Sequence, residues 1–96
     1  MSDITPMWQY LVWAMEGRGV MSTQSIYRHV KDWCARFERP LPDNWEAEIR
    51  QTLQANCASR PQYKGRADLF TFHKRGYWSC KAVSASIDEI AAQISN

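Results

Sequence analysis

The chain has 96 residues, of which 45% are hydrophobic, and a net charge of +2 with both histidines neutral. This length predicts a single domain over residues 1–96, and no apolar run approaches the roughly 18 residues that a membrane span needs. The first residues lack the basic and apolar segments of a secretion signal, and the three cysteines are an odd number without a CxxC pair. We therefore expect a cytoplasmic protein with reduced thiols.

Two helices are predicted in the first half of the chain. Thr5 followed by Pro6 is typical of an N-cap and a first helical residue, and apolar residues then recur at helical spacing until two glycines end the helix. A minimal strand is predicted at residues 20–21, and Ser22 or Thr23 then caps a second helix. The apolar stripe of this second helix comprises Ile26, Tyr27, Val30, Trp33, Cys34 and Phe37.

The second half of the chain predicts a third helix and a hairpin. Asp43 is predicted to cap the helix, with Glu46 as its capping-box partner. Two β-prone runs follow at residues 69–72 and 77–81, which predict a hairpin with a short loop. The loop residues are His73, Lys74, Arg75 and Gly76.

A last amphipathic helix is predicted at about residues 86–95, opened by a capping box from Ser86 to Glu89. The order helix, short strand, helix, helix, strand, strand, helix indicates the α+β class. The plan is that of a winged helix-turn-helix domain, with three helices, a β-hairpin wing and an added C-terminal helix. We expect the core of the domain to cover about residues 6–81 and the added helix to offer a surface for a homodimer.

Positive charge is concentrated in the middle of the chain. All twelve Lys and Arg residues lie between Arg18 and Lys81 with six acidic residues, so this span carries a net charge of +6. Such asymmetry favours a surface that faces phosphate groups. The candidate phosphate-binding residues, in the linker after the third helix and in the wing, are Arg60, Lys64, Arg66, His73, Lys74 and Arg75. The alternative is that the charges at the hairpin tip only guard an edge strand.

The outer face of the third helix offers side chains that can read bases. In the major groove, Arg bonds bidentately to guanine and Gln to adenine. The candidate base-reading residues are Asn44, Arg50, Gln51 and Gln54. One alternative is that Arg50 pairs with Glu46 across one turn. Glu46 and Glu48 are also an objection to DNA contact, although carboxylates at this end stabilise the helix dipole.

The hairpin carries four aromatic residues, which are Phe70, Phe72, Tyr77 and Trp78. They cannot all face inward from a hairpin with a two-residue repeat, so one or two are expected to be exposed, where an aromatic ring beside a basic loop can stack on a base. Core packing is the alternative. The sequence contains no phosphate-binding loop and no closely spaced metal ligands. We therefore expect no catalytic residues, no metal site, no cofactor and no enzymatic activity.

Four segments carry a family resemblance: SIY at residues 25–27, NWEAEIRQTLQ at 44–54, DLF at 68–70 and RGYW at 75–78. Over residues 8–81 the chain resembles the winged-helix domains attached to prokaryotic restriction-type nucleases, including the modification-dependent enzymes that recognise N6-methyladenine. The resemblance implies DNA binding through the third helix and the wing, and in some relatives the reading of a methylated base. It does not imply nuclease activity, because no nuclease domain fits in 96 residues.

Two functions follow as hypotheses. The first is binding of double-stranded DNA by the third helix and the wing, as a small regulator or a modified-base reader. The second is a protein-interaction module, an adaptor or inhibitor that uses the same scaffold without DNA. The modest net charge, the abundant aromatic residues and the two carboxylates of the third helix motivate this second hypothesis.

Overall fold

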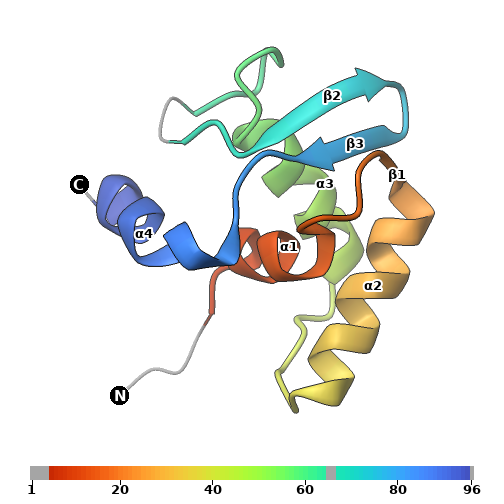
Figure 1. The fold of residues 1–96 in the computed structure, drawn as a ribbon. Helices are drawn as coiled ribbons and strands as arrows, with labels where there is room; N and C mark the ends of the chain where they lie inside the picture. Colours follow the sequence, from red (N-terminus) through yellow and green to blue (C-terminus); the bar gives the residue numbers. More distant parts are fainter. Residues whose placement is uncertain (1–4, 65–66, 96) are drawn as a thin grey trace.

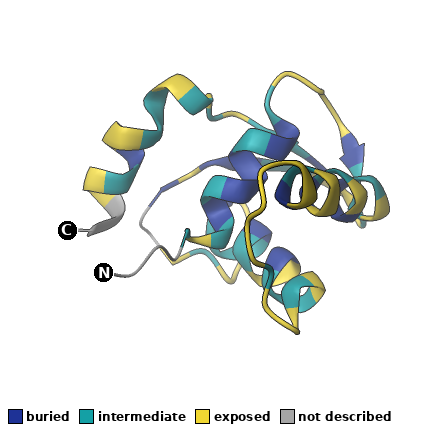
Figure 2. Cartoon of the chain, turned by 90° about the horizontal axis from the view of Figure 1, so that it is seen from below, coloured by how far each residue is buried: buried dark blue, intermediate teal, exposed yellow. Residues whose placement is uncertain are grey.

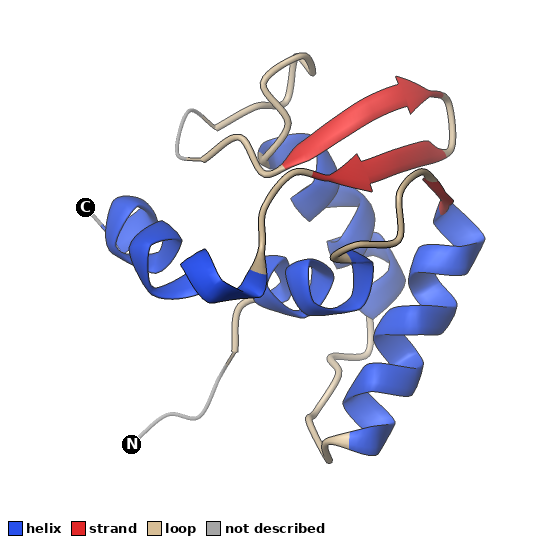
Figure 3. Ribbon diagram, in the orientation of Figure 1, coloured by secondary structure: helices blue, strands red, loops and turns tan. Residues whose placement is uncertain are grey.

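The computed structural model describes residues 5–64 and 67–95, with helices packed against one face of a small antiparallel sheet (Figure 1, Figure 3). The helices are α1 (Met7–Met15), α2 (Thr23–Arg36), α3 (Trp45–Ala55) and α4 (Ile87–Ser95). The strands are β1 (Met21–Ser22), β2 (Phe70–Lys74) and β3 (Tyr77–Cys80), and a 3-10 turn at Ser84–Ser86 leads into α4. The α+β class predicted from the sequence is confirmed.

The sheet has the strand order β1-β3-β2, so the short first strand lies beside the last one. β1 pairs antiparallel with β3, with Met21 opposite Trp78. The minimal strand predicted before α2 is therefore confirmed, one residue further along the chain. This pairing brings the start of α2 next to the β2–β3 turn, as Figure 1 shows.

The hairpin is confirmed, but its loop is shorter than predicted. β2 continues through Lys74, which pairs with Tyr77 of β3 after a register shift between Phe72 and Lys74. An irregularity of this kind inserts one residue and increases the local twist without ending the ladder. Only Arg75 and Gly76 remain in the turn, and His73 and Lys74 belong to the strand.

The predicted cap of α2 is confirmed for Ser22, whose Oγ accepts a hydrogen bond from the Ser25 backbone N–H at 3.1 Å. The predicted start of α1 is wrong by one residue. Pro6 has extended backbone angles (φ −60°, ψ 147°) and is itself the N-cap, so the helix begins at Met7. Thr5 therefore lies one position before the cap.

The capping box predicted for α3 is wrong. The helix begins at Trp45 with Asn44 as N-cap, and no side chain caps it. The Trp45 N–H instead donates to the Pro42 carbonyl at 3.1 Å. Because this backbone turn already leads into the helix, Asp43 lies before the cap and its carboxylate is one position too early for the motif.

The core lies where the helices meet the sheet, as the burial colouring of Figure 2 shows. Its largest fully buried side chains come from three helices, β2 and the loop after α3, and are Leu11, Val12, Met15, Ile26, Val30, Ile49, Leu53, Cys57 and Phe70. α4 contributes Ile90 to the core, while much of its remaining described surface is exposed. A homodimer through α4 stays a prediction.

Among the described residues, no helix combines the length and apolar character that crossing a membrane requires.

Two carboxylates fix loops to neighbouring elements of the fold. Asp68 accepts hydrogen bonds from the Lys81 ammonium group and, at 2.9 Å, from the Ala58 N–H, and these bonds lower its pKa. Glu16, at the end of α1, accepts hydrogen bonds from Ser84, which lower its pKa as well. The first contact holds the loop after α3 against the end of β3, and the second holds the segment before α4.

Acidification is expected to destabilise the fold through these two groups. Their pKa values are lowered in the folded protein, so their contribution to stability is present above the ordinary pKa values of 3.8 for Asp68 and 4.5 for Glu16 and is lost as the pH falls below them. Melting temperatures measured at neutral pH and at about pH 3 test this. Asp68→Asn should flatten the pH dependence, and a melting temperature that rises on acidification would contradict it.

Candidate nucleic-acid interface

A hollow of about 430 Å³ lies between α3, the start of α2 and the β2–β3 hairpin. Its lining residues are Thr23, Arg50, Arg60, Phe72, Arg75, Gly76 and Trp78. Three of them are arginines and none is acidic. A concave surface lined by one sign of charge concentrates ions of the opposite sign, so the hollow is suited to bind an anion.

Arg50 is held by α2. Its Nη1 donates to the Tyr27 hydroxyl at 2.8 Å, and the buried Tyr27 ring lies edge-on to Trp45 with centroids 5.7 Å apart. The pairing of Arg50 with Glu46 considered from the sequence is absent, since the ion pair found in the described part of the chain joins Lys81 and Asp68. The Tyr27 hydroxyl is uncharged, so it orients the Arg50 guanidinium group without neutralising its positive charge.

Arg60 is held by packing. Its guanidinium carbon lies 4.3 Å from the centroid of the Phe72 ring, a cation–π contact between the loop after α3 and β2. Its Nε is buried and has no hydrogen-bond partner within the described residues. The stacking on Phe72 therefore fixes the position of a guanidinium that no carboxylate neutralises.

Arg75 is positioned by the turn that it shares with Gly76. The Gly76 carbonyl accepts hydrogen bonds from both the backbone N–H and the hydroxyl of Thr23, at 2.9 and 3.2 Å. Gly76 has a φ of 82°, in the left-handed region that a side chain would strain. The turn is consequently pinned to the start of α2, and this keeps Arg75 at the edge of the hollow.

The other predicted base-reading residues lie around α3 but do not line this hollow. Gln51 lines a second one, of about 440 Å³, together with Lys64 and the start of α1. Asn44 is exposed at the N-cap, and Gln54 is half-buried. The outer face of α3 therefore lies between two hollows, with Arg50 towards the hairpin and Gln51 towards α1.

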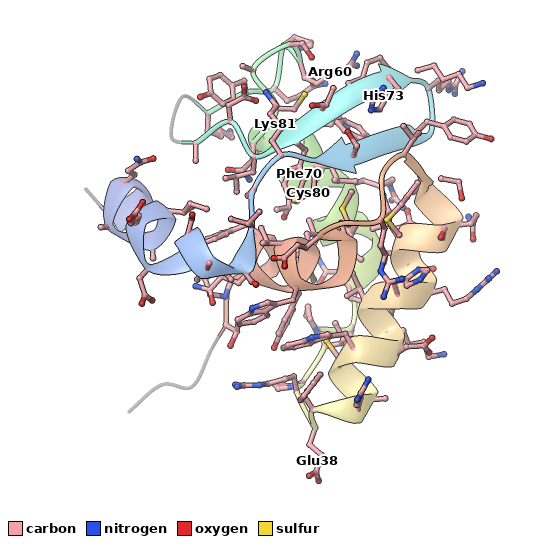
Figure 4. All side chains as sticks on the ribbon, in the orientation of Figure 1. Glu38, Arg60, Phe70, His73, Cys80 and Lys81 are labelled. Atoms are coloured by element: carbon pink, nitrogen blue, oxygen red, sulfur yellow. The ribbon has the colours of Figure 1, made fainter. Side chains whose placement is uncertain are left out.

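The predicted phosphate-binding residues of β2 are also separated from the hollow. His73 is exposed, with Nε2 2.8 Å from the Ser79 hydroxyl across the hairpin, and Figure 4 shows it on β2. The Lys74 ammonium group lies 4.7 Å from the centroid of the Tyr77 ring. Arg66 lies outside the described residues. The structure thus brings together Arg50, Arg60 and Arg75 and leaves His73 and Lys74 apart from them.

The two carboxylates of α3 differ in how far they are exposed. Glu48 is half-buried and lines both the α1-side hollow and an apolar one formed with Pro42 and Tyr10. Glu46 is exposed in the first turn of α3. Because Glu48 shares the α1-side hollow with Gln51 and Lys64, the objection to DNA contact holds for both carboxylates.

The hairpin aromatics divide as the two-residue repeat predicts. Phe70 and Trp78 are buried, Phe72 is half-buried, and Tyr77 is 39% exposed. A separate aromatic cluster lies between α1 and the end of α2, where the Trp13 and Trp33 rings stack at 4.7 Å and Phe37 beside them is exposed. The protein-interaction hypothesis stays a prediction.

The sequence did not indicate that Tyr27 would hold Arg50, or that Thr23 would hold the turn that carries Arg75. Tyr27 was assigned to the core stripe of α2 and Thr23 to a possible cap. Their partners, Arg50 and Gly76, are 23 and 53 positions away. No spacing within one element signals such contacts, since they depend on how α2, α3 and the hairpin pack.

Comparison of the chain with protein-family models, with curated proteins and with solved structures finds no match.

Proposed function

We propose that this protein binds double-stranded DNA through α3 and the β2–β3 hairpin, in the manner of a winged helix-turn-helix domain. The order of elements and the placing of β1 beside β3 support this plan. The observation that carries the proposal is the hollow lined by three arginines and by no acidic residue, at the junction of α3 and the hairpin. DNA-binding proteins obtain most of their non-specific affinity from such cations.

The residues divide by role. The outer face of α3 would enter the major groove, where Arg50, Gln51 and Gln54 read base edges and Asn44 contacts a base or a phosphate near the helix start. Phosphate contacts position the domain on the duplex without reading sequence. They would come from Arg60, Lys64, Arg66, His73, Lys74 and Arg75. A regulator or a modified-base reader is the biological role that this arrangement suits.

The proposal predicts salt-dependent binding to duplex DNA. Each phosphate that a cation neutralises contributes about 0.9 to the slope of log affinity against log salt concentration. Fluorescence anisotropy with a labelled duplex, at low and at moderate salt, measures this slope. A duplex carrying N6-methyladenine, compared with its unmethylated twin in the same assay, tests modified-base reading. Absence of binding at low salt would contradict the proposal.

A further inference from the structure

The hollow between α3 and the hairpin is larger and more apolar than a phosphate contact requires. Its volume of about 430 Å³ falls in the range of small-molecule sites, roughly 300–1,000 Å³. We propose, resting on the proposed DNA binding, that it holds one nucleotide whose base is unpaired. Phe72 and Trp78 form an apolar wall, and the arginines supply the cations that such a ligand needs.

The base side of this site is the stack of Arg60 on Phe72. Unpaired bases are recognised by stacking on aromatic rings and on the planes of Arg guanidinium groups. The Phe72 ring also meets Trp78 edge-on, with centroids 5.2 Å apart. Trp78 is buried, so its contact anchors the Phe72 ring, while the Arg60 guanidinium group lies over that ring. We place the base against the guanidinium group of Arg60, which lies over the Phe72 ring.

The phosphate side consists of Arg75 and of Arg50, which would contact a phosphate of the unpaired nucleotide here and a base edge on paired DNA. Arg50 uses Nη1 for the Tyr27 hydroxyl, which leaves Nη2 and Nε to donate to a phosphate. Arg75 is exposed on the turn at the opposite edge of the hollow. The Thr23 hydroxyl donates to Gly76 and so supplies no donor to the ligand. Two guanidinium groups beside an apolar wall match the two parts of a nucleotide.

A paired base cannot enter a concave site, because its edge and both faces are occupied within the duplex. The nucleotide must come either from DNA in which one base has left the stack or from a free nucleotide. An unpaired base costs least to extrude. DNA with a single unpaired nucleotide and a free mononucleotide are therefore the two sources to separate.

Three duplexes of one sequence test the site by anisotropy: fully paired, with one bulged adenosine, and with an abasic residue in the same bulge. The abasic duplex has the same number of nucleotides and phosphates and lacks only the bulged base, so its comparison with the adenosine bulge isolates the base. We expect the adenosine bulge to bind roughly 5- to 150-fold more tightly than the abasic bulge, the effect of one stacked base. Equal affinity for the two bulges would overturn the inference.

Arg60→Lys is the discriminating variant. Lysine retains the charge but has no planar group to stack, so the affinities for the adenosine bulge and the abasic bulge should become about equal. The matched control is Arg36→Lys at the end of α2, which alters an arginine that also lies over a phenylalanine, with its guanidinium carbon 5.5 Å from the centroid of the Phe37 ring. This control should retain the preference.

Failure of the site and failure of DNA binding give different results. Binding of all three duplexes with equal affinity leaves the proposed function intact and rejects the nucleotide site. Binding of deoxyadenosine monophosphate that Arg60→Lys weakens, with no binding of any duplex, supports the site and rejects DNA binding. If neither the duplexes nor the mononucleotide bind, both proposals are rejected.

Discussion

Simultaneous replacement of Arg50, Arg60 and Arg75 by alanine is expected to lower the affinity for paired duplex DNA by roughly 100-fold or more. Loss of an arginine contact to DNA costs about 1–3 kcal/mol, and these three residues line one hollow without an acidic neighbour in its lining. The slope of log affinity against log salt should also decrease by about 2, because Arg60 and Arg75 are the proposed phosphate contacts among the three and each lost contact removes about 0.9. Anisotropy titrations at several salt concentrations measure both quantities.

The control for this variant carries the same loss of charge elsewhere. Lys31, Arg36 and Arg39 are exposed in the second half of α2 or just beyond it. The 14 residues of α2 span about 21 Å, which separates Arg36 from Thr23 at the hollow. Alanine at these three positions should weaken binding only slightly. If both triple variants lost the same affinity, net charge rather than the hollow would hold the DNA.

Local sequence patterns predicted the elements well because the forces that form them are local. The Ser22 cap depends on Ser25, three positions away, and the hairpin depends on a glycine that tolerates a left-handed backbone. The α3 capping box failed although its residue types fit. The Trp45 N–H donates to the Pro42 carbonyl instead, and the side-chain pattern could not predict that backbone hydrogen bond.

The candidate site was predicted only in part, for a different reason. The residue types of α3 and the hairpin indicated cations near aromatics. They could not indicate that Arg60 stacks on Phe72, because that contact depends on how the loop after α3 folds back onto β2. The residue types also could not show that His73 lies against Ser79 whereas Arg75 lines the hollow. Element formation is encoded locally, whereas the meeting of side chains from different elements is decided by packing.

Phe70→Ala is expected to reduce the free energy of unfolding by about 3–5 kcal/mol, the usual cost of removing a buried phenylalanine side chain. Phe70 is fully buried, and Figure 4 shows it between the sheet and the helices. A domain of this length has about 5–14 kcal/mol of stability in total, so the variant should lose a large share of it. The expected fall in melting temperature is roughly 12–40 °C.

Phe37→Ala is the matched control, because it removes the same atoms from a side chain that is 52% exposed. Its effect should be about 1 kcal/mol, since about half of the side chain is already in contact with water. Urea denaturation followed by circular dichroism measures both variants. Equal losses would mean that the layer between sheet and helices does not carry the stability. The attachment of β2 to the end of α3 would then depend on backbone bonds, such as that from the Phe70 N–H to the Asn56 carbonyl at 3.2 Å, rather than on the Phe70 ring.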